Sequence, residues 1–217
     1  MRAQNFLNTL LAAHGANAAN LNLARAATLA QNANLRGGWE VWLQVEIAQC
    51  LMTYQANWAC VREAPYPSFN NALNPYLTYG AGVGAGVTAN ANAAARCDFF
   101  LRRAVPNAIA DDTYLELKVI SAAAANPLND AWGRFAADIN KQAALAGLNN
   151  TLNCISLLAT FGTFNPGDVA GPNPSLAWCW AGGRSAYVFD PTNAAVTTLQ
   201  NVSQGGGNRL FLVAVSV

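Results

Sequence analysis

YLELKVI, at residues 114–120, alternates apolar and charged side chains and contains no Gly or Pro. Such alternation is typical of a β-strand that buries one face, because successive side chains along a strand point to opposite faces. We therefore expect Leu115 and Leu117 to enter the core, and Glu116 and Lys118 to project together from the other face. A charged pair within an apolar strand is costly to bury without partners, so we look for a functional site on that face.

The preceding predicted strand is RCDFFLRR, at residues 96–103, and it carries Asp98 among apolar residues. If the two strands pair, Asp98 and Glu116 come together beside Lys118. Two close carboxylates repel each other unless a positive charge lies between them. Mg²⁺, or Mn²⁺ in its place, takes oxygen ligands and is usually held by one or two carboxylates with water and phosphate. The three residues thus predict a metal site for phosphodiester hydrolysis, with Lys118 assisting the attacking water.

The segments on either side of these strands predict an α/β fold. The expected elements, in chain order, are a helix at 39–53, strands at 54–64, 96–103 and 114–120, a helix at 130–146, and strands at 153–161, 187–189 and 209–217. A mixed central β-sheet flanked by helices is the economical packing for this order. Residues 65–95 and 162–185 hold clusters of Pro and Gly and are predicted to be long loops that flank the substrate.

Residues 1–36 are rich in Ala, Asn and Leu and are predicted to form a helical N-terminal arm, with residues 37–217 as the main domain. Apolar residues recur at helical spacing from Phe6 to Leu11, and residues 21–29 suggest a second helix. The arm is a candidate cap, docking segment or oligomerisation segment. We expect any homodimer or protein partner to bind through it.

The order of elements, with Asp98 on one strand and Glu116-Leu117-Lys118 on the next, resembles the PD-(D/E)XK superfamily, which includes restriction endonucleases. The resemblance covers residues 39–160 and departs at Cys97, where the motif has Pro. It implies a restriction endonuclease-like core and a Mg²⁺- or Mn²⁺-dependent nuclease. We expect DNA rather than RNA as the substrate, in an enzyme of the restriction, defence or toxin type.

The resemblance also implies further site residues. Many members carry on the first helix a Glu that supports the metal. In this chain Glu40 and Glu46 lie in the corresponding predicted helix, but they are six positions apart and therefore do not share a helical face. We prefer Glu46, which lies deep in the apolar run, and place Glu40 second. Members often place a Lys or Gln on the helix after the ExK strand, which Lys141 or Gln142 supplies. The basic residues expected to contact phosphate are Arg96, Arg102 and Arg103.

Plainer interpretations stay open for each of these residues. Glu116 and Lys118 are also compatible with an ion pair on a solvated sheet face. Asp98 is compatible with a pair to one of the arginines that end its strand. Glu40 stands where a helix dipole favours an acid, and Glu46 suits a buried ion pair as well as a metal.

The composition bounds the class of protein. Hydrophobic residues make up 53% and charged residues 11% of the 217 residues, as in a globular chain rather than a disordered one. The net charge is +1, so nucleic-acid binding would depend on a local basic patch. This weak basicity favours the alternative function, that of a catalytically inactive nuclease-fold protein acting as a binding or assembly module.

Absent motifs exclude other classes. The five cysteines form no CxxC pair, which argues against a zinc site. They also indicate a reducing compartment, so we expect a cytoplasmic protein, with a secreted toxin as the alternative. His14 is the only histidine, and the sequence has neither a GxGxxG nor a P-loop motif. No run of 18 apolar residues occurs, so no membrane span is expected.

Overall fold

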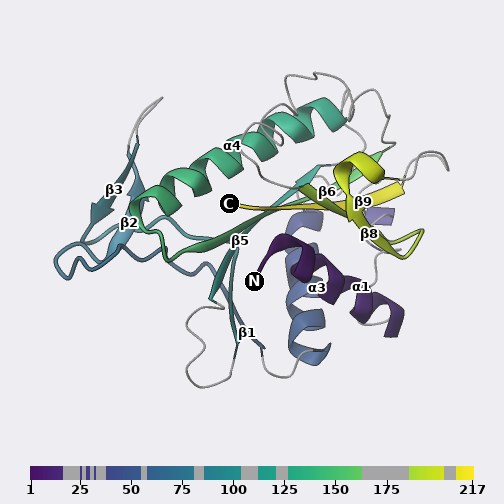
Figure 1. Ribbon diagram of the computed structural model, residues 1–217, viewed down its shortest axis with the longest axis horizontal. Helices are drawn as coiled ribbons and strands as arrows, with labels where there is room; N and C mark the ends of the chain where they lie inside the picture. The colour runs from purple at the N-terminus through teal and green to yellow at the C-terminus, as the bar shows by residue number, and fades with distance from the viewer. Residues whose placement is uncertain are drawn as a thin grey trace.

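The computed structural model describes residues 1–16, 25, 28–29, 32, 38–54, 58–80, 86–103, 112–120, 127–162, 186–202 and 209–217. This part of the chain forms a mixed α/β fold around a seven-stranded sheet (Figure 1). Across the sheet the strands are β1 (Trp58–Arg62), β4 (Phe99–Arg103), β5 (Thr113–Ile120), β6 (Asn153–Gly162), β9 (Arg209–Ser216), β7 (Ala186–Asp190) and β8 (Ala195–Thr198). The predicted central sheet flanked by helices is thereby confirmed.

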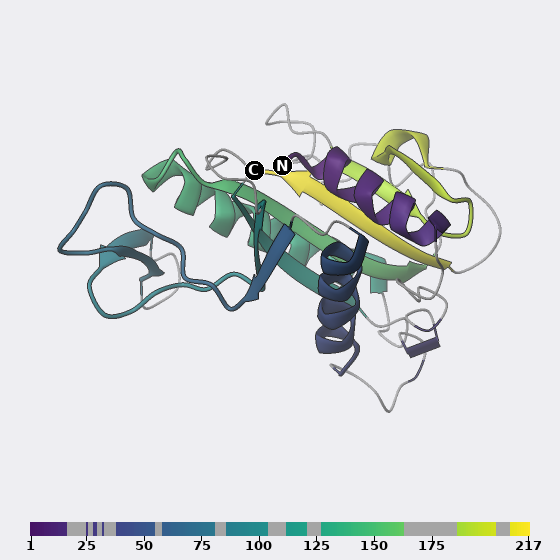
Figure 2. The same ribbon diagram turned by 90° about the horizontal axis from the view of Figure 1, so that it is seen from below.

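Helices cover both faces of the sheet (Figure 2). One face packs against α1 (Ala3–Ala16) and α3 (Gly38–Tyr54), and the other packs against α4 (Pro127–Leu148). A 3-10 turn, Leu199–Asn201, follows β8. No helix in the described part of the chain is both long and apolar enough to cross a membrane.

The alternation in β5 has the predicted consequence. Leu115 and Leu117 are buried in the cluster under α1 and α3, which leaves Glu116 and Lys118 on the face that α4 covers. β5 pairs antiparallel with β4 and parallel with β6. A parallel pair needs a crossover, and α4 supplies it between β5 and β6. The central strand therefore holds its two charged residues between the sheet and this crossover helix.

The N-terminal helix is part of the core and not a separate arm. Phe6, Leu7 and Leu10 have no exposed surface and belong to the same cluster as the β5 leucines. The backbone N–H of Ala3 donates to Oγ of Ser216 at 2.8 Å, joining the two ends of the chain. The predicted helix is present as α1, and of the roles considered for residues 1–36 the cap fits it, since the sheet covers its apolar face. Most of the second predicted helix lies outside the described residues.

The expected loop at 65–95 contains a hairpin that the sequence analysis missed. Strands β2 (Tyr76–Tyr79) and β3 (Val87–Asn90) pair antiparallel and stand out beside one end of α4 (Figures 1 and 2). Aromatic and β-branched residues favour these two strands, although each has only four residues. The strand β8 was missed as well, because it too has only four residues. The predicted loop 162–185 lies outside the described residues except for Gly162.

The chain between β1 and β4 is fixed by a sharp turn. Glu63 follows β1 with a φ of 54°, a left-handed conformation that residues other than glycine adopt rarely. The segment after it pairs with the segment before β4, through the backbone N–H of Cys97 to the carbonyl of Ala64 at 3.0 Å. As a result, Tyr66 lies over β5, and Asp98 lies immediately before β4, next to Glu116.

Candidate active site

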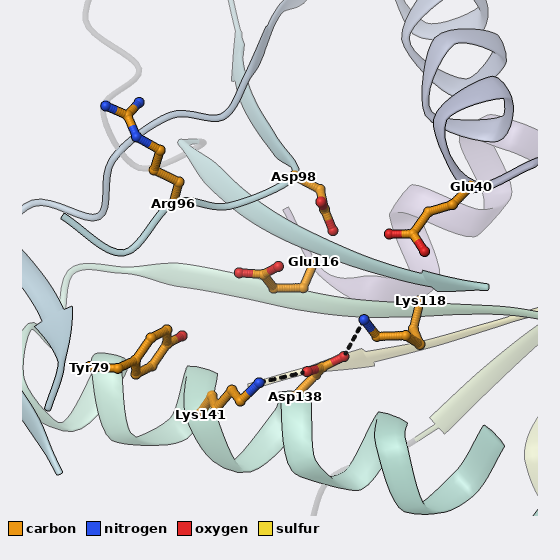
Figure 3. A pocket seen from close by; sticks show the side chains of 8 residues that line it. All are labelled: Glu40, Tyr79, Arg96, Asp98, Glu116, Lys118, Asp138 and Lys141. Atoms are coloured by element: carbon orange, nitrogen blue, oxygen red, sulfur yellow. Dashed lines mark hydrogen bonds and ion pairs between the residues drawn. The ribbon is translucent and has the colours of Figure 1, made fainter. Parts of the chain in front are cut away.

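A pocket of about 240 Å³ opens over the charged face of β5, between the first turn of α3, the β2–β3 hairpin and α4 (Figure 3). The residues that line it are Glu40, Tyr79, Arg96, Asp98, Glu116, Lys118, Asp138 and Lys141. Four of them are acids and three are bases, so the pocket gathers charge of both signs. The three residues predicted as the centre of the site are all among them.

Strand register brings Asp98 and Glu116 together. Phe99 pairs with Leu115 in the antiparallel ladder of β4 and β5, so the next position outward places Asp98 opposite Glu116. The backbone N–H of Leu117 donates to Oδ2 of Asp98 at 2.6 Å. The expected approach of the two acids is thereby confirmed, and a backbone hydrogen bond fixes one of them.

The second oxygen of Asp98 is held from α3. Nε2 of Gln44 donates to Oδ1 of Asp98 at 3.1 Å, and the guanidinium of Arg62 donates to Oε1 of Gln44 at 2.8 Å. Gln44 is buried, so this chain of contacts has few alternative geometries. Asp98 is bonded to these groups and not to Arg102, which rules out the ion pair considered above for that arginine.

Glu116 is held by a buried polar network behind the pocket. The hydroxyl of Tyr66 donates to Oε1 of Glu116 at 2.7 Å. Nε2 of Gln142 lies 3.5 Å from that hydroxyl and donates to the carbonyl of Ile155 at 3.3 Å, while Ser156 donates to Oε1 of Gln142 at 2.5 Å. Gln142 has no exposed surface. Its predicted contact with substrate is therefore wrong, and it supports Tyr66 instead.

Lys118 and Lys141 converge on one carboxylate of α4. Nζ of Lys118 lies 3.7 Å from Oδ2 of Asp138, and Nζ of Lys141 lies 3.4 Å from Oδ1 (Figure 3). The ion pair of Lys118 is thus with Asp138 and not with Glu116. Sequence reasoning missed Asp138, although a signal was present: it stands three positions before Lys141 and therefore on the same helical face.

The structure places Glu40, and not Glu46, at the pocket. Glu40 lies in the first turn of α3, and its carboxylate is directed toward Lys118 in Figure 3. Glu46 does not line the pocket. The preference for Glu46 is wrong because the side of α3 that faces Asp98 carries Glu40 and Gln44, four positions apart, and Glu46 lies on another side of the helix.

The three predicted phosphate-binding arginines separate in the structure. Arg96 lines the pocket, and its guanidinium donates to the carbonyl of Glu63 at 2.6 Å. Arg102 forms a two-point contact with Asp112, at 2.9 and 2.6 Å, and does not line the pocket. The side chain of Arg103 lies outside the described residues.

Burial makes Glu40, Asp98 and Glu116 difficult to ionise. It raises the pKa of Glu116 to about 8, against the opposing effect of the Tyr66 hydrogen bond, and the negative charge of Asp98 raises that pKa further. The pKa of Asp98 and that of Glu40 are likewise raised, first by burial. A cation placed among these carboxylates would offset both the burial and the repulsion.

The donor set of the pocket fits a hard divalent cation. The acidic donors are carboxylate oxygens, which suit Mg²⁺ or Mn²⁺ and not a thiolate-binding metal. Among the described residues, no group of three or more His, Cys, Asp or Glu side chains is arranged to hold a metal by itself. Mg²⁺ does not require such a group, because it commonly binds one or two carboxylates and keeps water and substrate phosphate as its other ligands.

Comparisons of this chain with protein-family models, with curated proteins and with solved structures find no match.

Proposed function

We propose that this chain is a metal-dependent nuclease that hydrolyses phosphodiester bonds, with DNA as the preferred substrate. The observation that supports it best is the meeting of Asp98, Glu116 and Lys118 in one pocket, Asp98 from just before β4 and the other two from the neighbouring strand β5. The element order α3, β1, β4, β5, α4, β6 supports it too, because the PD-(D/E)XK core has the same order of helix, three strands, helix and strand.

Asp98 and Glu116 are the residues proposed to hold Mg²⁺, with Glu40 as a third carboxylate of the same pocket. When bound, the metal would lower the pKa of its water and stabilise negative charge on the leaving oxygen. The contacts to Asp98 and the Tyr66 hydrogen bond to Glu116 fix both carboxylates before any ligand arrives. Such preorganisation lowers the cost of binding a cation in one geometry.

Lys118 is proposed to donate from its ammonium to the substrate phosphate and to the attacking water. Its separation of 3.7 Å from Asp138 is too long for a hydrogen bond, so the ammonium keeps donors for a ligand. Lys141 and Arg96 lie at the same pocket and would neutralise the neighbouring phosphates. Asp138 keeps the two lysines close together in the absence of substrate.

The test is cleavage of plasmid DNA, single-stranded DNA and RNA with Mg²⁺ or Mn²⁺. The parent is compared with Asp98→Asn, Glu116→Gln and Lys118→Ala, and Glu46→Gln serves as the control because this acid lies outside the pocket. We expect the first three variants to lose about 100-fold or more of the rate, as for removal of a charge-stabilising group. EDTA should abolish cleavage by the parent, and the control should cleave as the parent does.

A folded parent that cleaves none of these substrates would overturn the proposal. The net charge of +1 favours the alternative in that case, a nuclease-fold protein that binds or assembles without catalysis. Calorimetric titration with Mg²⁺ would then separate a pocket that still binds metal from one that does not.

A further inference from the structure

Tyr79 is the one aromatic residue among those that line the pocket. Its side chain reaches from β2 toward the space between Glu116 and Lys141 (Figure 3). The residue is 37% exposed, and its hydroxyl makes no hydrogen bond to any described residue. An aromatic ring that is exposed at a charged pocket offers a flat apolar surface next to the place proposed for a phosphate.

The backbone of β2 holds this ring in position. The N–H of Leu77 donates to the carbonyl of Tyr66 at 2.9 Å, and the N–H of Ala95 donates to the carbonyl of Leu77 at 2.7 Å. The side chain of Leu77 is buried under the same hairpin. Tyr79 lies two positions further along, on the same face of the strand, and therefore faces the pocket. These backbone contacts place Tyr79 at the wall of the pocket.

The cationic side chains of the pocket are enough to contact only a small number of phosphate groups. Lys118, Lys141 and Arg96 are its three cationic side chains, and the whole chain has a net charge of only +1. A protein that binds duplex DNA through its phosphates can make about six to ten such contacts. A site with three cations needs another source of affinity, and base stacking on an aromatic ring supplies one that does not depend on base identity.

The size of the pocket agrees with a small unit of substrate. Its volume of about 240 Å³ is below the range of roughly 300–1,000 Å³ that is usual for pockets enclosing a drug-sized ligand. A stacked base pair cannot present one base face to Tyr79, because the neighbouring pairs cover both faces. A base of an unpaired strand has free faces and can stack on the ring.

We infer that the pocket takes an unpaired strand of nucleic acid, with the base of one nucleotide stacked on Tyr79 while its phosphate lies beside Lys118 and Lys141, next to the cation proposed for Asp98 and Glu116. The inference rests on the proposed function and names its substrate class. Tyr79 is then a residue that selects substrate, whereas cleavage itself depends on Asp98 and Glu116.

The experiment measures binding by fluorescence anisotropy with a labelled DNA strand of about 12 nucleotides, a length within the range that one binding site covers. Ca²⁺ replaces Mg²⁺ because it takes the same oxygen ligands, and a gel verifies that the probe stays intact. The variants are Tyr79→Ala, Tyr79→Phe and, as matched control, Tyr76→Ala. Tyr76 is 36% exposed and lies three positions from Tyr79, on the other face of the same strand, and it does not line the pocket.

We expect the parent to bind the single strand more tightly than its duplex. Tyr79→Ala should weaken that binding by roughly 5- to 150-fold, the loss of one stacked base, while Tyr79→Phe and Tyr76→Ala keep the parent's affinity. The dependence of log K on log salt for the single strand should have a slope of about −2, since three phosphate contacts release about that many counterions.

Tighter binding of the duplex, an unchanged affinity in Tyr79→Ala, or an equal loss in Tyr79→Phe would overturn the inference. None of these outcomes bears on whether the parent cleaves DNA. A parent that cleaves in Mg²⁺ while Tyr79→Ala binds normally would leave the nuclease proposal standing and remove only the role of Tyr79.

Discussion

The buried carboxylate Glu116 should make the metal-free protein less stable as the pH rises. Burial raises its pKa from 4.5 to about 8 in the folded protein. The pKa of Glu116 is higher in the folded state than in the unfolded state, so the folded state binds the proton of this carboxyl more tightly. The protonated carboxyl therefore contributes its full share to the free energy of unfolding below pH 4.5, and this contribution is lost as the pH rises through about 8. At 1.36 kcal/mol for each pKa unit, full ionisation of Glu116 costs about 5 kcal/mol at most.

The substitution that isolates this cost is Glu116→Gln. Glutamine keeps the shape of the side chain and an oxygen that accepts the hydrogen bond from Tyr66, but it carries no charge. In EDTA we expect the variant to exceed the parent in free energy of unfolding by several kcal/mol at pH 9, and by less than about 1 kcal/mol at pH 5. The assay is urea denaturation followed by tryptophan fluorescence across this pH range.

Two further measurements make the outcome decisive. Glu46→Gln removes an acid of α3 that lies outside the pocket, so its free energy of unfolding should follow that of the parent at each pH. Added Mg²⁺ should stabilise the parent at pH 8 more than it stabilises Glu116→Gln, since a ligand stabilises the state that binds it. A Glu116→Gln variant that is less stable than the parent by the same amount from pH 5 to pH 9 would refute the reasoning.

Three other substitutions test separate parts of the site. Tyr66→Phe removes the donor to Glu116 and should raise the pKa of that carboxyl, moving the pH profile of cleavage upward; an unchanged profile would contradict this role. Glu40→Gln should weaken Mg²⁺ binding by about 10-fold or more in calorimetric titration, whereas Glu46→Gln should not, and equal effects would argue against Glu40 at the metal. Asp138→Asn frees two lysines and should lower KM for DNA by about 2- to 5-fold, the strength of a partly exposed ion pair; a higher KM would count against competition by this acid.

The part of the site that could be predicted from the sequence is the part that local periodicity dictates. The period of two in YLELKVI placed Leu115 in the core and Glu116 on the other face, and both placements are confirmed. The neighbouring strand with Asp98 pairs as expected, because antiparallel strands joined by a short segment tend to be adjacent. The helix that connects two parallel strands was predicted as well.

The errors concern contacts that no local pattern encodes. Glu46 was preferred over Glu40 because it lies deeper in an apolar run, but that run faces the core on the side of the sheet away from the pocket. Six residues along a helix also mean about 9 Å along its axis. Which side of α3 is directed toward the pocket depends on how the whole helix crosses the sheet, and that side carries Glu40 and Gln44.

Tyr79 and Asp138 line the pocket but were not predicted, because their positions also depend on contacts between segments that lie apart in the sequence. Tyr79 reaches the pocket because Leu77 is hydrogen bonded to segments around residues 66 and 95, well apart in the sequence. The four residues of β2 are too short a run to predict a strand, and nothing in them indicates which face is covered. Asp138 was recognisable from its helical spacing to Lys141, but only after Lys141 had been assigned to the site.

The low charge of the chain is itself an argument for a functional pocket. Charged residues make up 11% of the sequence, yet they are seven of the eight residues that line the pocket. Gathering them costs stability, since burial raises the pKa of Glu116, Asp98 and Glu40 alike. A fold that needed only stability would place apolar side chains or solvated single charges there. The cost is explained if a cation and a phosphate complete the pocket, and perturbed acids gathered in a cleft are typical of sites that bind or react.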